Sequence, residues 1–197
     1  MNRGLRIVMV LFAALMHGSH GIADDIDHLT IPSSGAILEA TDTLQCDVDS
    51  RADAQECLTG LRWTPGDFKI RCESADMDRG DLLIRFDSPV DTRNKINDNV
   101  SMEWYVARDK ERHPVSARAI VIVHESGRGM TVGRIFAKGL NAQGLHTFLI
   151  HLPGYGNRRS ETSGKVEFIL SGMKQAIADV RRANNRTGHR NNSRCFK

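Results

Sequence analysis

The alternation of apolar and polar positions is clearest over residues 119–159, where it predicts a strand, a helix and a second strand. Residues 119–123 (AIVIV) form an unbroken apolar run, which is typical of a parallel strand buried on both faces. Apolar residues then recur at helical spacing, at Val132, Ile135, Phe136 and Leu140. Residues 145–152 form a second apolar run. This segment therefore predicts a βαβ unit, and ligands of open α/β sheets bind at the edge where such strands end.

Short strand-like runs precede this unit, and one long amphipathic pattern follows it. Residues 68–71 and 82–86 predict two short strands, and residues 101–108 alternate in the manner of a half-buried strand. These two or three strands are expected to be antiparallel. Over residues 165–183, one apolar helix face is formed by Val166, Ile169, Leu170, Met173, Ile177 and Val180. The fold class predicted from the order of these elements is α/β.

The first 23 residues have the pattern of a secretory signal peptide. Two arginines precede an apolar run at residues 7–16, and small residues lie before Asp24. Ten apolar residues are too few to span a bilayer, although an uncleaved anchor is the alternative. No later stretch is long and apolar enough to cross a membrane. We therefore expect export to the periplasm or the medium, with no stable membrane span in the mature chain.

The remaining chain divides into three parts by composition. Residues 24–67 show no clear period and are expected to be an irregular extension, apart from a short helix near residues 54–61. Residues 68–183 hold the predicted domain. Residues 184–197 form a basic tail expected to be disordered. The overall 40% apolar and 26% charged residues are ordinary for a globular protein.

Charge and cysteine content narrow the expected partners. The last 17 residues carry five arginines and one lysine without an acid, so they hold +6 of a net charge of only +3. A basic tail can bind nucleic acid, but an exported protein makes that partner unexpected. Pairing in an oxidising compartment is open among four cysteines, Cys46, Cys57, Cys72 and Cys195. Their spacing has no CxxC pair, so no zinc site or other metal site is predicted.

The order of the elements and two of the loops resemble the N-terminal half of an α/β-hydrolase, of the serine esterase or dienelactone hydrolase kind. The turn His124-Glu125-Ser126-Gly127 stands where that family places a loop donating one oxyanion-hole N–H. The segment Leu152-Pro153-Gly154-Tyr155-Gly156 is similar to the family's loop after the next strand. Residues 165–183 are similar to the helix before the nucleophile strand. The resemblance covers about residues 81–183 and implies a partial α/β-hydrolase sheet, antiparallel strands followed by a βαβα unit.

The resemblance implies hydrolysis of a small ester or similar acyl substrate through a serine nucleophile, without a cofactor. It makes the turn residues His124, Glu125, Ser126 and Gly127 oxyanion-loop candidates. It makes the second loop a substrate-edge candidate through Gly154, Tyr155, Arg158 and Arg159.

The chemistry of the family needs a nucleophile elbow, followed by an acid and a histidine. The sequence contains no G-x-S-x-G, and no apolar run follows residue 183. No catalytic residue is therefore assigned, and we expect the chain as given to be inactive. Two explanations are open: a truncated or frameshifted product, or a genuine short protein that uses the half-domain as an exported binding or interaction module. In either case the sheet is expected to have an unpaired edge.

Two other interpretations of the glycine-rich turn are weaker. Ser126 lies beside His124 and Glu125, but chain neighbours rarely adopt the geometry of an activated nucleophile. The glycines at 127, 129 and 133 follow a strand and open a helix, as in a dinucleotide loop. Their spacing is not G-x-G-x-x-G, and no acid follows the next strand to hold a ribose.

Overall fold

The computed structural model describes residues 28–42, 50–58, 61, 65–125, 127, 129–159 and 166–184. The predicted signal peptide, the basic tail beyond residue 184, Ser126, Cys46 and Cys195 lie outside these residues. Cys72 is buried in the core, with 1% of its surface exposed. Among the described residues, no helix is both long and apolar enough to cross a bilayer.

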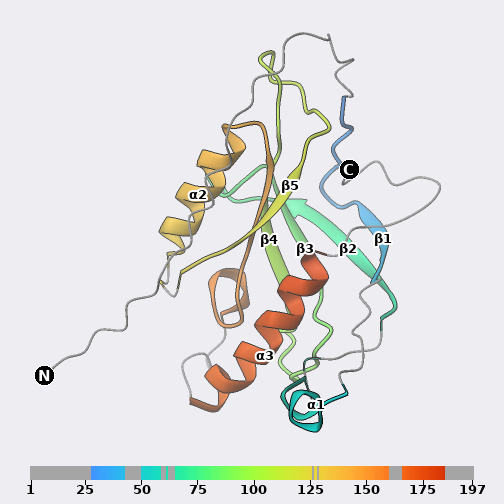
Figure 1. The fold of residues 1–197 in the computed structure, drawn as a ribbon. Coiled ribbons are helices and arrows are strands. Elements are labelled where there is room, and N and C mark those ends of the chain that lie inside the picture. The colour runs from blue at the N-terminus through green and yellow to red at the C-terminus, as the bar shows by residue number, and fades with distance from the viewer. Residues whose placement is uncertain are drawn as a thin grey trace, which may run out of the picture.

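Six strands form one mixed sheet, which confirms the α/β class (Figure 1). In spatial order they are β1 (Ile37–Thr41), β2 (Asp67–Ser74), β3 (Leu82–Asp87), β4 (Asn99–Tyr105), β6 (His146–Ile150) and β5 (Ala119–Val123). Neighbours from β1 to β4 are antiparallel, as is the β4–β6 pair, whereas β5 and β6 are parallel. The sequence predicted this parallel pair and the antiparallel strands before it.

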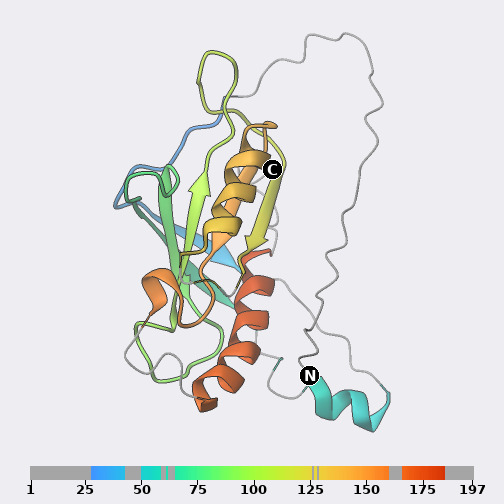
Figure 2. The ribbon, with the colours of Figure 1, turned by 90° about the vertical axis from the view of Figure 1, so that its left-hand side faces the viewer.

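The helices are α1 (Ala52–Leu58), α2 (Thr131–Asn141) and α3 (Val166–Ala183), with a 3₁₀ turn η1 at Gly156–Arg158. Helices α2 and α3 run alongside the strands (Figure 2). On one face of the sheet, Val180 and Ala183 of α3 pack against the main core. On the other face, Ala137 of α2 packs against Leu149 and Tyr105. Because Leu149 and its neighbour Phe148 point to opposite faces of β6, the two helices cover opposite sides.

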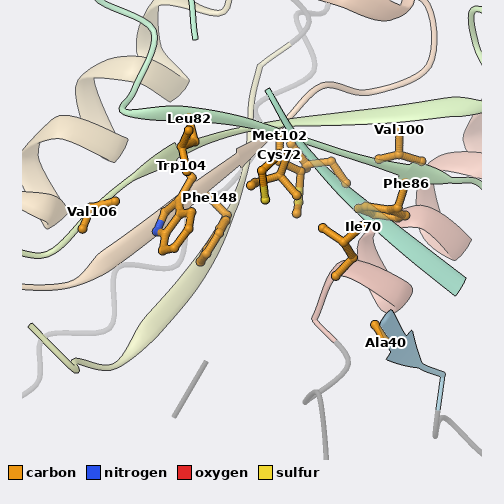
Figure 3. Close-up of a cluster of buried hydrophobic side chains, with 12 residues drawn as sticks. Ala40, Ile70, Cys72, Leu82, Phe86, Val100, Met102, Trp104, Val106 and Phe148 are labelled. Atoms are coloured by element: carbon orange, nitrogen blue, oxygen red, sulfur yellow. The ribbon is translucent and has the colours of Figure 1, made fainter. Parts of the chain in front are cut away.

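The main core lies under α3 and contains both aliphatic and aromatic side chains (Figure 3). Its twelve buried residues are Ala40, Ile70, Cys72, Leu82, Ile84, Phe86, Val100, Met102, Trp104, Val106, Phe148 and Ile150. The rings of Trp104 and Phe148 stack with centroids 5.3 Å apart. This core joins the antiparallel half of the sheet to the βαβ unit.

Two expectations about strands were wrong. The stretch 24–67 was expected to be irregular, yet it contains β1, which pairs with the whole first half of β2. The short β1 has only one buried residue, Ala40, so its sequence shows little period. Residues 101–108 were expected to form a half-buried strand, but β4 lies between β3 and β6 and is buried on both faces.

The expected burial of β5 was also wrong. Its apolar run predicted a strand covered on both faces, but β5 is the last strand of the sheet. Ile120 is 39% exposed and Val123 is 51% exposed. Val121 and Ile122 pack against the two cores, but the outer edge of β5 has no neighbouring strand in the described part of the chain, so part of the apolar run is exposed.

Both long helices also expose part of their apolar stripes. In α2 the residues against the sheet are the small Gly133 and Ala137, and three larger residues remain exposed, Val132, Ile135 and Phe136. A Cβ at Gly133 would lie 2.8 Å from the Cβ of His124, so the helix approaches β5 and β6 more closely than a larger residue allows. In α3, Met173 and Ile177 are likewise exposed.

Candidate functional site

The two predicted loops meet at the edge where β5 and β6 end. The backbone N–H of Leu152 donates to Nε2 of His124 over 3.2 Å. The rings of His124 and Tyr155 lie edge to face, with centroids 4.9 Å apart. His124 is buried, and that burial lowers its pKa. The structure therefore brings the oxyanion-loop and substrate-edge candidates into contact, through the ring of His124.

Glu125 caps the N-terminus of α2 with its side chain. Its carboxylate accepts the backbone N–H groups of Val132 at 3.2 Å and of Gly133 at 3.1 Å. Burial acts to raise the pKa of Glu125, but these N–H groups and its own N–H lower it below the usual value. A helix N-terminus is where a phosphate binds in a dinucleotide loop. Because a carboxylate already occupies those donors, the geometry disfavours a nucleotide there.

The loop after β6 is fixed around His151. The N–H of Asn157 donates to Nδ1 of His151 over 3.2 Å, so Nε2 carries the hydrogen that faces the carboxylate of Glu103 at 3.1 Å. Gly156 has φ +51°, and a Cβ there would lie 2.6 Å from Nδ1 of His151. The proline-glycine-aromatic-glycine turn thus needs its second glycine for a close approach as well as for its backbone conformation.

Glu103, in the middle of β4, is the centre of a buried charge network that the sequence interpretation missed. Its carboxylate accepts from Nη2 of Arg134 at 2.6 Å and from the hydroxyl of Tyr105 at 2.9 Å, in addition to His151. Burial alone would raise the pKa of Glu103, but these hydrogen bonds outweigh it and lower the pKa to about 2. The pKa of Tyr105 is raised by burial and by Glu103. The signal in the sequence that could have revealed this network is a single acidic residue within an apolar strand.

Arg158 lies in the core beside this edge. Its exposed fraction is 0%, and its Nη2 lies 2.8 Å from Oδ2 of Asp179 in α3. Its Nε donates to the carbonyl of Asn97, and its Nη1 donates to the carbonyl of His151. The resemblance made Arg158 a candidate for contact with substrate at this edge. Its side chain instead joins the loop after β6 to α3, out of reach of solvent.

The other candidates occupy the surface of the same edge. Gly154 (φ +81°) and Tyr155 are partly buried, and the N–H of Gly154 donates to Oδ1 of Asn97. Arg159 is exposed. Gly127 accepts the N–H of Met130 at its carbonyl, which shapes the turn into α2. Ser126 lies outside the described residues.

One group of side chains in the described part of the chain has metal-like spacing. It consists of Asp109, Glu111 and His113, in the turn after β4. The carboxylate of Asp109 already accepts the backbone N–H groups of Glu111 and His113. These hydrogen bonds within the turn explain why the three side chains lie close together.

Chemically, the edge offers a buried imidazole, a turn of backbone groups and an aromatic ring. Within the described residues, both ring nitrogens of His124 and His151 are engaged, with backbone groups or with Glu103. Neither histidine is therefore placed to activate a nucleophile in this arrangement. No protein-family model and no curated protein matches the chain.

Proposed function

We propose that the chain is an exported α/β-hydrolase-like protein that does not itself hydrolyse esters. In this proposal residues 81–183 are the front half of a hydrolase sheet, and the edge formed by His124, Tyr155 and their loops is the remnant of an acyl-binding side. The family's activity, hydrolysis of an ester or similar acyl bond, would need groups that this sequence does not contain.

One observation carries the proposal: the oxyanion-type turn and the loop after β6 meet at the end of a parallel strand pair. This is where an open α/β sheet binds its ligand. The same observation supports the lack of turnover, because the imidazoles at this edge already bond to the chain. A hydrolase triad instead needs a histidine that faces a nucleophile.

A hydrolysis assay tests the proposal directly. The purified chain is incubated with p-nitrophenyl acetate and p-nitrophenyl butyrate, and release of nitrophenolate is compared with a blank. We expect no saturable turnover above the blank. Saturable turnover that Ser126→Ala abolishes, and that Ser88→Ala preserves, would show a working serine nucleophile and overturn the proposal.

The second candidate is an exported binding or interaction module without catalysis. The observation that favours it is the exposure of apolar residues on β5, α2 and α3 together. Exposed apolar surface of that extent on a small domain marks an interaction site. Under this alternative the hydrolase-like edge has only a structural role, and the exposed apolar surface binds the partner.

A further inference from the structure

The open edge of β5 is a second, separate feature of the molecule, and its backbone groups point outward in a definite pattern. The N–H of His146 donates to the carbonyl of Arg118 over 2.9 Å, so residue 118 faces β6. Along a strand the direction of the backbone groups alternates. Residues 119, 121 and 123 therefore turn their N–H and C=O groups to the outside. In the described part of the chain, β5 pairs with β6 alone.

The edge lacks the features that normally prevent strand pairing. Residues 119–123 carry no charge, no proline and no glycine. The opposite edge, β1, is different, because it carries Glu39, whose carboxylate lies 3.8 Å from Nζ of Lys69. Of the two sheet edges, β5 is thus the one suited to pairing with another strand.

Helix α2 extends this surface on one face of the sheet. Arg134 and Asn141 reach Glu103 and Tyr105 of β4, which fixes one flank of the helix toward the interior of the sheet. At 3.6 residues per turn, Val132 and Phe136 lie on the other flank, beyond β5. Val132 is 48% exposed and Phe136 is 43% exposed.

Helix α3 carries exposed apolar residues on the other face of the sheet. Arg182 reaches Asp42 and lies over the ring of Phe68, on the β1 and β2 side of the helix. At 3.6 residues per turn, Met173 and Ile177 lie on the side of α3 away from Arg182. Helix α3 also contacts β5. Met173 is 62% exposed and Ile177 is 45% exposed. Exposed apolar side chains therefore lie on both of the helices that contact β5.

We propose that this surface binds a second copy of the chain, with β5 pairing antiparallel to β5 across a two-fold axis. An axis normal to the sheet sets α2 against α2 and α3 against α3, so each apolar flank meets its own equivalent. No like charges are brought together on β5, where they would oppose pairing. Each copy uses its own β5 edge once, so the assembly ends at two subunits. The two outer ends of the joined sheet are the charged β1 edges.

The extent of the surface fits a dimer. The exposed apolar residues Ile120, Val123, Val132, Phe136, Met173 and Ile177 leave on the order of 600 Å² uncovered, of the same order as the roughly 800 Å² that each partner buries in a stable interface. The register that pairs all five residues of β5 places Ala119 opposite Val123 and Val121 opposite its own equivalent. This proposal does not depend on the hydrolase relationship.

Sedimentation of the purified chain over a range of concentrations tests the proposal. We expect a monomer–dimer equilibrium, and Ile120→Lys is expected to raise the dimer dissociation constant at least tenfold. Ile37→Lys is the matched control, because Ile37 is an exposed isoleucine (60%) on the other edge strand. It is expected to leave dimerisation unchanged. A folded monomer at all concentrations, or equal sensitivity to both substitutions, would refute the pairing and leave the edge to a different partner.

A cross-linking experiment tests the register without depending on a destabilising change. Ala119→Cys and Val123→Cys both alter exposed positions. The proposed register predicts that a mixture of the two variants forms a disulfide between residues 119 and 123, because paired Cα atoms about 5.5 Å apart suit a disulfide. Peptide mass spectrometry identifies the link among the native cysteines. A 119–119 or 123–123 link in either variant alone, without the mixed link, would contradict this register.

Discussion

The buried network around Glu103 gives the sharpest quantitative prediction. Glu103→Gln removes the negative charge but keeps the size of the side chain. The amide then presents an N–H₂ group toward Arg134, Tyr105 or His151, all of which are donors to the native carboxylate. Arg134 loses its ionic partner while its side chain is only 20% exposed. Removing one member of a buried pair is therefore expected to cost far more than the pair contributes on balance.

The magnitude follows from the pKa of Glu103. A fall from 4.5 to about 2 on folding corresponds to about 3 kcal/mol of unfolding free energy at neutral pH. Because the folded-state pKa is the lower one, this contribution is complete above about pH 4.5 and is lost as the pH falls toward 2. At pH 3, about 1.5 kcal/mol of it should remain.

Urea denaturation followed by circular dichroism measures the effect. Glu103→Gln is expected to unfold about 3 kcal/mol more easily than the wild type at pH 7, and the difference should shrink as the pH falls toward 2. The control is Glu73→Gln, which breaks the pair with Arg85 at a carboxylate that is 44% exposed. That change should cost less than about 1 kcal/mol. Equal losses for the two variants, or a difference for Glu103→Gln that does not vary with pH, would refute the assignment.

Two further changes test the packing around the site. Gly133→Ala is expected to destabilise the fold by about 1–3 kcal/mol in the same assay, because its Cβ would lie 2.8 Å from His124 and 2.9 Å from Leu149. Gly139→Ala in the same helix meets nothing within 4 Å and should stabilise by up to about 1 kcal/mol, so a loss from both would contradict the close approach at Gly133. Asp179→Ala leaves the buried guanidinium of Arg158 without its carboxylate and should cost about 3–5 kcal/mol, measured as a lower urea midpoint. Asp76→Ala, which breaks an exposed pair with Arg79, is the control, and a loss as large as that of Asp179→Ala would show that burial does not set the cost.

The order of the elements was predictable from the sequence because each signal is local. The run at residues 119–123 and the helical spacing after it have the same form whatever surrounds them. The glycines at 154 and 156 both adopt the positive φ that a tight turn requires. The candidate edge was found in the same way, because loops that follow neighbouring parallel strands end at one side of a sheet.

The roles of individual side chains were not predictable, because they depend on partners distant in the chain. Glu103 meets Arg134 and His151, which lie 31 and 48 residues away. Arg158 was expected at the substrate edge, but its side chain is buried and forms an ion pair with Asp179 in α3. A charged residue has the same local pattern whether it is solvated or paired in the core, so only the packing of strands and helices distinguishes the two.

The sequence by itself determined a mixed α/β arrangement, the parallel pair at its end and the two turns that meet there. Only the tertiary structure decided which apolar residues are covered. The same stripe that marks a helix as amphipathic faces the sheet in one protein and lies open in another, because coverage depends on which element lies beside it. In this chain β5 is at the edge, so Ile120, Val132 and Phe136 remain exposed where the sequence pattern alone places them in a core.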